Sequence, residues 1–124
     1  MRASLKSLPK VFESEEGSVR GADWGDMHVE VDVFDKEFDV TPFLKGLPND
    51  LDQCPHWGYV IRGGLRVRYP DREETIREGE AYYIAPNHTL IASAGTECIE
   101  FSPKDKFART MEAVERNMAV PTGG

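Results

Sequence analysis

The sequence has few cysteines and no long apolar stretches, and each shortage excludes a class of protein. No run approaches the roughly 20 apolar residues that a membrane-spanning helix needs, so we expect no membrane partner. Cys54 and Cys98 are the only cysteines among 124 residues, and no apolar stretch near Met1 is long enough for a secretory signal. We therefore expect free thiols and a cytoplasmic location.

Positive charge is also scarce. The formal net charge is −7, which argues against a nucleic-acid partner because phosphate binding needs a basic surface. Arg62, Arg66 and Arg68 are a local exception, and their alternation on a strand favours a solvated outer face over an anion site. Hydrophobic residues make up 40% of the chain and charged residues 30%, proportions typical of one soluble globular domain.

Most of the chain consists of short segments in which apolar and polar residues alternate. Residues 27–34 place valines on one face and His28, Glu30 and Asp32 on the other, which predicts a strand with one solvated face and a surface position for His28. Further strands are predicted over 55–62, 65–69, 73–77, 80–84, 89–94 and 97–101, with turns at Gly63-Gly64 and Pro86-Asn87. Many short strands at this spacing indicate a β-sandwich or barrel.

The two ends of the chain have a different pattern. Residues 1–26 are weakly patterned and are expected to pack on the barrel or on a partner, with 10–12 as an edge strand. Residues 103–119 are predicted to form a helix capped by Ser102, with an apolar stripe of Phe107, Met111, Val114 and Met118. The predicted organisation is one domain: an N-terminal segment (1–26), a barrel (27–102) and a C-terminal helix (103–119).

A candidate site begins in the segment before the first central strand. Alternation over 55–62 places His56, Gly58 and Val60 on one face. Because the apolar face should be the inner one, His56 is predicted to point into the barrel near its mouth, where an imidazole needs a hydrogen bond or a metal. Cys54 and Asp52 share its parity, and thiolate, imidazole and carboxylate all ligate divalent transition metals.

A second group of candidates follows the later turn. His88 comes directly after Pro86-Asn87 and is expected on the barrel rim or just inside it. Alone it fits a structural role, whereas its place in a segment that matches that of His56 favours a shared site. Tyr82 and Tyr83 are adjacent, so one of them faces the lumen. A lumen-facing tyrosine is either a packing residue or a ligand contact.

The stretch from Cys54 to Ser102 resembles the cupin superfamily. Tyr59-Val60-Ile61-Arg62-Gly63-Gly64-Leu65-Arg66-Val67 is similar to the end of the first cupin motif. Gly79-Glu80 to Pro86-Asn87 is similar to the start of the second, with Asn87 where glycine is usual. More narrowly, the chain looks like small single-domain bacterial cupins with a Cys-Pro-His-Trp-Gly-Tyr-Val segment. The resemblance implies an all-β fold, an antiparallel jelly-roll barrel with one C-terminal α-helix.

The resemblance also implies a site in the barrel, although the residues depart from the usual pattern. His56 stands where the first motif places a glutamate ligand, and Asp50 and Asp52 stand where it places histidines. His88 lies two residues before the position of the second motif's histidine. The candidate ligands for one divalent transition metal (zinc, iron, nickel or manganese) are His56, His88, Cys54 and Asp52. The candidate contacts for a small polar molecule are His56, His88, Tyr83 and Tyr59.

Three functions remain open at this point. The expected one is a cytoplasmic homodimer that binds a small carboxylate- or sugar-like molecule at the barrel mouth, with or without a metal. The second is a metal-dependent enzyme of the dioxygenase, isomerase or decarboxylase type, as in other cupins. The third is a barrel whose role is association, through the face of Trp57 or the apolar stripe of the helix.

Overall fold

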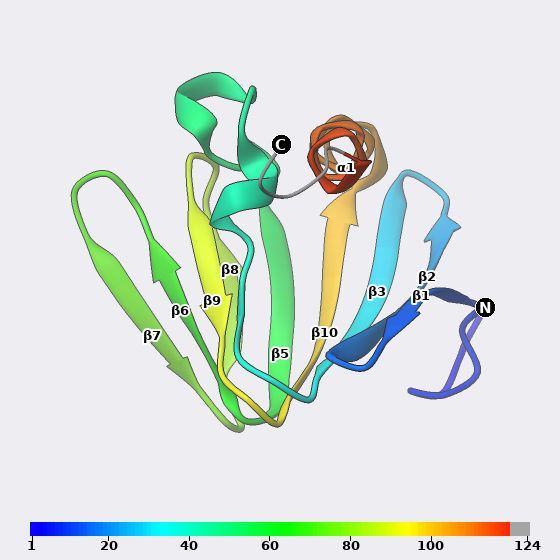
Figure 1. The fold of residues 1–124 in the computed structure, drawn as a ribbon. Coiled ribbons are helices and arrows are strands. Elements are labelled where there is room, and N and C mark those ends of the chain that lie inside the picture. The colour runs from blue at the N-terminus through cyan, green and yellow to red at the C-terminus, as the bar shows by residue number, and fades with distance from the viewer. Residues whose placement is uncertain (120–124) are drawn as a thin grey trace.

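The computed structural model describes residues 1–119 as two antiparallel sheets that face each other, with a helix across one end (Figure 1). One sheet has six strands in the order β1-β2-β3-β10-β5-β8, and the other has four in the order β4-β9-β6-β7. Every pairing is antiparallel. Two such sheets form a jelly-roll barrel, so the predicted fold class is confirmed.

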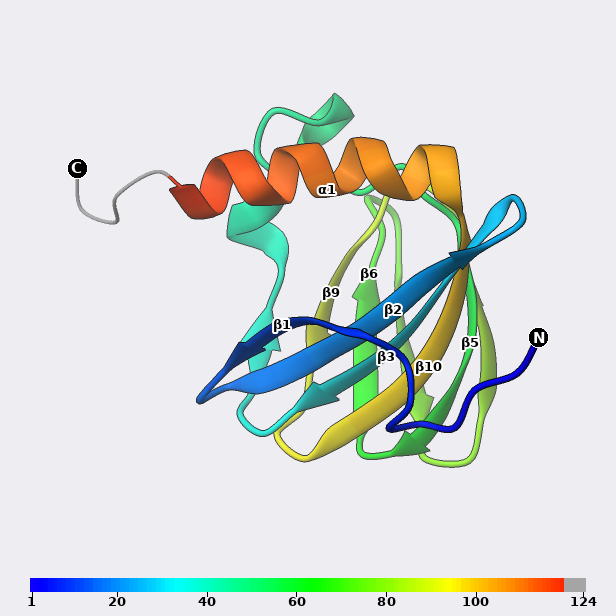
Figure 2. The same cartoon turned by 90° about the vertical axis from the view of Figure 1, so that its right-hand side faces the viewer.

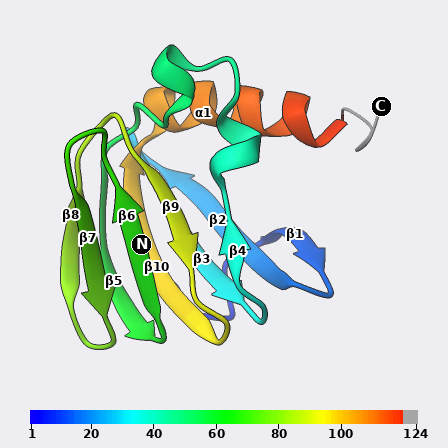
Figure 3. The same ribbon diagram turned by 60° about the vertical axis from the view of Figure 1, so that its left-hand side comes forward.

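The strand bounds agree closely with the alternation in the sequence. The six-stranded sheet consists of β1 (Lys10–Ser14), β2 (Gly17–Trp24), β3 (Met27–Phe34), β5 (His56–Arg62), β8 (Ala81–Ile84) and β10 (Thr96–Pro103). The four-stranded sheet, seen from its own side in Figure 3, consists of β4 (Phe38–Asp39), β6 (Gly64–Arg68), β7 (Glu73–Arg77) and β9 (Thr89–Ala92). Strand β2 was not predicted, because its residues do not alternate.

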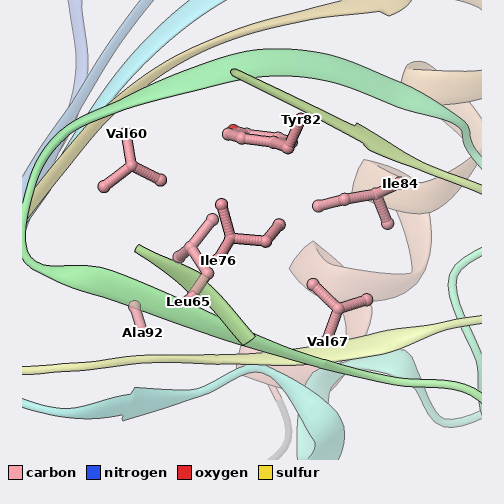
Figure 4. Close-up of a cluster of buried hydrophobic side chains, with 7 residues drawn as sticks. All are labelled: Val60, Leu65, Val67, Ile76, Tyr82, Ile84 and Ala92. Carbon is pink, nitrogen blue, oxygen red and sulfur yellow. The ribbon is translucent and has the colours of Figure 1, made fainter. Parts of the chain in front are cut away.

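The apolar core fills the part of the barrel between β5, β8 and the second sheet. Its side chains point toward one another from five strands in Figure 4, namely Val60, Leu65, Val67, Ile76, Tyr82, Ile84 and Ala92. Full burial of each large aliphatic side chain stabilises the fold by about 1.5–3 kcal/mol. The core thus closes one part of the barrel with packed side chains, and the buried polar residues of β3 and β10 occupy another part.

A second apolar cluster lies on the outer face of the six-stranded sheet. Leu8 packs with Val29 and Val31 of β3, and Ile99 and Phe101 of β10 lie against this cluster. Figure 2 shows the N-terminal chain crossing this face. Because the N-terminal segment covers the apolar side of β3, the polar side of that strand faces into the barrel. The predicted solvated face of β3 is therefore wrong.

Helix α1 (Lys104–Ala119) follows β10 directly and lies over one end of the barrel (Figures 1 and 2). It contacts the 3-10 turn η1 (Thr41–Leu44) through Asn117, whose Nδ2 donates to the carbonyls of Phe43 (2.7 Å) and Lys45 (2.8 Å). A second 3-10 turn, η2 (Pro48–Asp50), follows in the chain. Its buried residues are Thr110 and Ala113. Neither this helix nor another in residues 1–119 is long and apolar enough to cross a membrane.

Two details of the predicted helix differ from the structure. Ser102 belongs to β10 and does not cap the helix, which begins at Lys104. Met118, expected in the apolar stripe, is 48% exposed. Thr110 and Ala113 are buried beside the other three residues of the predicted stripe, Phe107, Met111 and Val114, which are partly buried.

Gly58 marks a close approach between β5 and its neighbours. It pairs with Tyr82 of β8, and a Cβ atom at position 58 would lie 2.4 Å from Tyr82 Cζ and 2.5 Å from the carbonyl oxygen of Ile99. The Tyr82 ring therefore uses the space that a side chain would fill. From there, the hydroxyl of Tyr82 donates a hydrogen bond of 2.9 Å to Glu100 Oε1.

We predict that Gly58→Ala lowers the free energy of unfolding by about 3 kcal/mol, the upper end of the usual cost of overpacking. Urea denaturation is the measurement. The control is Gly95→Ala, because a Cβ at position 95 has no heavy atom within 4 Å while the backbone φ there is 79°. This variant should lose only about 1 kcal/mol of unfolding free energy, the cost of a left-handed conformation for alanine. Equal losses in the two variants would contradict the close approach.

Candidate functional site

Asp52, His56 and His88 come together beside α1 because two separate segments pair through their backbones. The N–H of Asp52 donates to the carbonyl of His88 (2.7 Å), and the N–H of His88 donates back to the carbonyl of Asp52 (3.1 Å). His56 is the first residue of β5, four residues after Asp52. The local pairing thus fixes one carboxylate and two imidazoles at the same end of the barrel.

The three side chains form a buried cluster around one oxygen atom. Asp52 Oδ2 lies 3.1 Å from His56 Nε2 and 3.5 Å from His88 Nε2. The two imidazole rings are nearly perpendicular, with centroids 5.2 Å apart. Asp52 is 7% exposed, His56 4% and His88 0%. The inward direction predicted for His56 is confirmed, and His88 lies inside the barrel with it.

The protonation of His88 follows from its partners. Its Nδ1 lies 2.7 Å from the carbonyl oxygen of Ala85, and because a carbonyl only accepts, Nδ1 carries the proton. In the neutral ring, Nε2 then presents a lone pair. That nitrogen is buried and has no hydrogen-bond partner within residues 1–119, although it faces the carboxylate of Asp52. A lone pair facing a carboxylate is unfavourable unless a cation lies between them.

Asp52 is held by donors on its other oxygen. Oδ1 accepts hydrogen bonds from the backbone N–H of Cys54 (2.8 Å) and from the hydroxyl of Thr110 on α1 (2.7 Å). Burial opposes ionisation of Asp52, but the hydrogen bond with His56 and the charge of that ring outweigh it and hold the pKa of Asp52 well below its ordinary value. Asp52 is therefore a carboxylate with Oδ2 directed at the histidines.

His56 lies between two carboxylates. Its Nδ1 is 2.7 Å from Ser102 Oγ and 3.4 Å from Glu100 Oε2, and its Nε2 faces Asp52. Burial alone would lower the pKa of His56, but the charges of Glu100 and Asp52 and the hydrogen bond to Asp52 raise it to about 9. Without a metal, His56 is an imidazolium at neutral pH, and the proton on Nε2 occupies the position in which a metal would bind.

Cys54 does not join the cluster through its sulfur. The residue is fully buried, and Sγ lies 3.4 Å from the carbonyl oxygen of Pro55. Burial, together with the charges of Asp52 and Glu100, raises the pKa of the thiol to about 12, so it stays protonated. The ligand-capable group contains Asp52, His56 and His88 without Cys54, which corrects the predicted ligand set. Cys54 and Cys98 are both free thiols, as expected.

The tyrosines expected at the site point away from it. Tyr59 is 43% exposed and Tyr83 51%, and Tyr83 lies against Trp57 on the outer face, with ring centroids 5.2 Å apart. Tyr59 and Tyr83, predicted as contacts of a small polar ligand, therefore lie on the outer face of the barrel and not beside the Asp52 cluster. The lumen-facing tyrosine is Tyr82, because its partner Gly58 belongs to the inner face of β5.

A set of carboxylates inside the barrel was missed. Glu30, Asp32 and Glu100 each offer one oxygen within 4.8 Å of the others. His28 was also misplaced: its ring stacks on Phe107 of α1 with centroids 4.0 Å apart, and its Nε2 lies 3.3 Å from Glu30 Oε2. The alternation of β3 contains the signal for His28, Glu30 and Asp32. It does not tell which face of the strand is the inner one.

This geometry defines a class of protein: a jelly-roll barrel with a buried cluster of two histidines and one carboxylate at one end. No protein-family model and no curated protein matches the sequence. Among solved structures, a cupin-2 domain protein from Shewanella frigidimarina is similar, with 18% identity, a TM-score of 0.52, and coverage of 73% of this chain and 84% of that chain.

Two further structures support the same assignment. An RmlC-like cupin from Shewanella frigidimarina has 14% identity and a TM-score of 0.56, with coverage of 82% of this chain and 88% of that chain. A protein from Neisseria meningitidis has 13% identity and a TM-score of 0.55, with coverage of 83% and 99%. The protein is thus a small domain with the cupin fold, as the motifs predicted. The narrower Cys-Pro-His-Trp-Gly-Tyr-Val group stays a prediction.

The turn before His88 contains a residue in the left-handed region of backbone conformation. Asn87 stands where glycine is usual, and its φ is 74°, in the left-handed region that glycine adopts freely and asparagine tolerates. Its N–H donates to the carbonyl of Asp52 (2.8 Å). The turn therefore sets the position of His88 relative to Asp52.

We predict that the chelator-treated protein loses stability as the pH rises through about 9. The pKa of His56 is 6.5 in the unfolded chain and about 9 in the fold. The stabilisation of the fold by the protonated ring is therefore complete below pH 6.5 and is lost above pH 9. Between these values the free energy of unfolding should fall by on the order of 1 kcal/mol per pH unit. Urea denaturation of wild type and His56→Asn from pH 6 to 9.5 measures this.

The third histidine supplies the control. His28→Asn should keep the wild-type slope in this window, whereas His56→Asn should have a flatter profile. Identical slopes in wild type and His56→Asn would show that the imidazolium of His56 does not stabilise the fold.

Proposed function

We propose that this small cupin binds one divalent transition metal through Asp52, His56 and His88 and thereby holds a small polar molecule at the barrel mouth. The observation that carries the proposal is the nitrogen His88 Nε2, which is buried, has no hydrogen-bond partner within residues 1–119 and faces Asp52 Oδ2 at 3.5 Å. A cation between these atoms would satisfy both of them. The same cation would replace the proton on His56 Nε2.

The groups around the three side chains support this proposal. Metal-binding histidines usually donate their second ring N–H to a carbonyl or carboxylate. The Nδ1 of His88 donates to Ala85, and the Nδ1 of His56 faces Ser102 and Glu100. These contacts leave both Nε2 atoms directed at Asp52. Two imidazoles and one carboxylate suit zinc, iron, nickel or manganese.

The chain's own residues would bind and orient a ligand in a site with little water. The hydroxyl of Thr110 on α1 donates to Asp52 Oδ1 and so fixes the carboxylate. Burial of Asp52, His56 and His88 excludes bulk solvent from the cluster. A bound metal would supply a Lewis acid with open coordination positions. Those open positions also favour the second candidate, a metal-dependent cupin enzyme, in which the same three residues hold the metal. Because α1 covers the cluster, we propose that only a small molecule reaches it.

We predict that the chelator-treated protein binds one Zn²⁺ per chain in isothermal titration, and that His88→Ala weakens this binding by at least about 100-fold, beyond the usual effect of losing an outer partner. The reason is that His88 Nε2 is buried and has no hydrogen-bond partner within residues 1–119, so a metal would be its partner. His28→Ala removes the histidine outside the cluster and should bind Zn²⁺ as the wild type does.

Elemental analysis of the purified protein gives a second, independent measurement. If the wild type carries no stoichiometric transition metal and cannot be loaded with Zn²⁺, Ni²⁺, Mn²⁺ or Fe²⁺, the metal site does not exist. If His88→Ala binds Zn²⁺ like the wild type, the metal is held elsewhere.

We also propose that the protein forms a homodimer in the cytoplasm through the outer face of β5 and β8. Trp57, Tyr59 and Tyr83 place three large aromatic side chains on this face, each more than 40% exposed. A contiguous apolar patch on a soluble domain commonly marks a contact with another protein. The face belongs to the barrel sheet and leaves the Asp52 cluster on the inner side.

We predict that light scattering gives twice the protomer mass for the wild type, and that Trp57→Lys gives the mass of one protomer, because a charge would be buried in the contact. Phe12→Lys changes a similarly exposed aromatic residue on β1, at the other edge of the sheet, and should stay dimeric. A monomeric wild type at working concentration would exclude the dimer.

A further inference from the structure

Three carboxylates from β3 and β10 face one another inside the barrel. Glu30 and Glu100 are directly opposite in the β3–β10 pairing, and Asp32 is the next inward residue along β3. One oxygen from each lies within 4.8 Å of the others. Asp32 and Glu100 are each 8% exposed. Carboxylates so close and so buried repel one another strongly unless a cation or protons neutralise them.

The polarity of this sheet shows that the cluster is built into the fold. The apolar residues of β3, Val29 and Val31, face outward and are buried under Leu8 of the N-terminal segment. The acidic residues of the same strand therefore face inward. A strand that served only to fill a core would place the valines inside and the carboxylates in water.

The surrounding groups leave one acceptor without any partner. Glu100 accepts from Tyr82 and lies near His56, and Glu30 lies 3.3 Å from His28 Nε2. Asp32 Oδ1 is buried and has no hydrogen-bond partner within residues 1–119. The buried polar residues of this part of the chain include no lysine or arginine. An unpartnered, buried carboxylate oxygen is costly and points to a ligand that supplies positive charge.

We infer that Glu30, Asp32 and Glu100 form a second cation site, separate from the Asp52 cluster, which takes a hard divalent cation such as Ca²⁺. Calcium binds oxygen ligands at about 2.3–2.6 Å, so oxygens on opposite sides of the ion lie about 4.6–5.2 Å apart. The mutual distances of the three oxygens fit within this span. An all-oxygen set selects hard cations, whereas the imidazoles of the other site select transition metals. Mg²⁺ fits less well because it keeps several waters.

The two sites would share one residue. Glu100 is a direct ligand candidate in the carboxylate cluster, and its Oε2 lies 3.4 Å from Nδ1 of His56. Glu100 would therefore bind the Ca²⁺ of the carboxylate cluster and would also orient His56, a ligand of the transition metal in the Asp52 cluster. The two cations would differ in chemistry, so each site can be titrated with its own probe.

The test is isothermal titration of the chelator-treated full chain with Ca²⁺, combined with thermal denaturation at each Ca²⁺ concentration. The wild type should bind one Ca²⁺ per chain, with a higher unfolding temperature. Asp32→Asn keeps the shape of the side chain and removes its charge, and it should weaken Ca²⁺ binding by at least about 10–100-fold, the range found even for outer partners of a metal. Asp35→Asn, an exposed residue just after β3, should behave as the wild type.

The alternative is that protons alone neutralise the cluster. In that case Asp32→Asn would raise the unfolding temperature equally with and without Ca²⁺. The wild type would also show no heat of Ca²⁺ binding in the isothermal titration. Either result overturns the inference. Unchanged Ca²⁺ affinity in Asp32→Asn would also overturn it. If Asp32→Asn does not fold, Glu30→Gln takes its place with the same expectations.

A pair of crossed titrations separates this inference from the proposed transition-metal site. His88→Ala should lose Zn²⁺ and keep Ca²⁺, whereas Asp32→Asn should lose Ca²⁺ and keep Zn²⁺. Loss of both ions in Asp32→Asn would mean that the carboxylate cluster only supports the Asp52 cluster. That result would overturn the Ca²⁺ site and leave the transition-metal site standing.

Discussion

The ionised carboxylate of Asp52, buried under α1, is the constraint that organises one end of the barrel. A charge withdrawn from water needs donors on both oxygens, and here they come from three residues. The backbone of Cys54 and the hydroxyl of Thr110 donate to Oδ1, and His56 donates to Oδ2, which His88 Nε2 also faces. Helix, turns and strands are thus connected through one side chain, and the fold in this region depends on it.

The interior of this barrel is divided between apolar and acidic halves. The apolar cluster formed by β5 to β9 contains one polar group, the hydroxyl of Tyr82, whereas the inner faces of β3 and β10 carry Glu30, Asp32 and Glu100. Tyr82 and His56 stand at the boundary, because both contact Glu100. The acidic half connects to the Asp52 cluster through His56, so positive charge bound in either place would affect the electrostatics of the other.

Local alternation predicted the strands well, and it predicted the inner face wherever one face was clearly apolar. His56 was placed correctly because Val60 shares its face. Two failures have the same origin. Alternation cannot tell which face of β3 is covered by Leu8, a residue about 20 positions earlier. It also cannot choose between Tyr82 and Tyr83, since the choice depends on the register with Gly58. Thr110 was missed because its role depends on how α1 docks.

The absence of a loop between β10 and α1 limits how this segment can vary in length. Strand β10 ends at Pro103 and the helix begins at Lys104, so the distance along the chain from Ser102, beside His56, to Thr110, beside Asp52, is fixed by regular structure. One inserted residue would rotate the rest of the helix by about 100° and carry the threonine off the carboxylate. Relatives that keep this arrangement should therefore accept many substitutions between these two residues but no insertion or deletion.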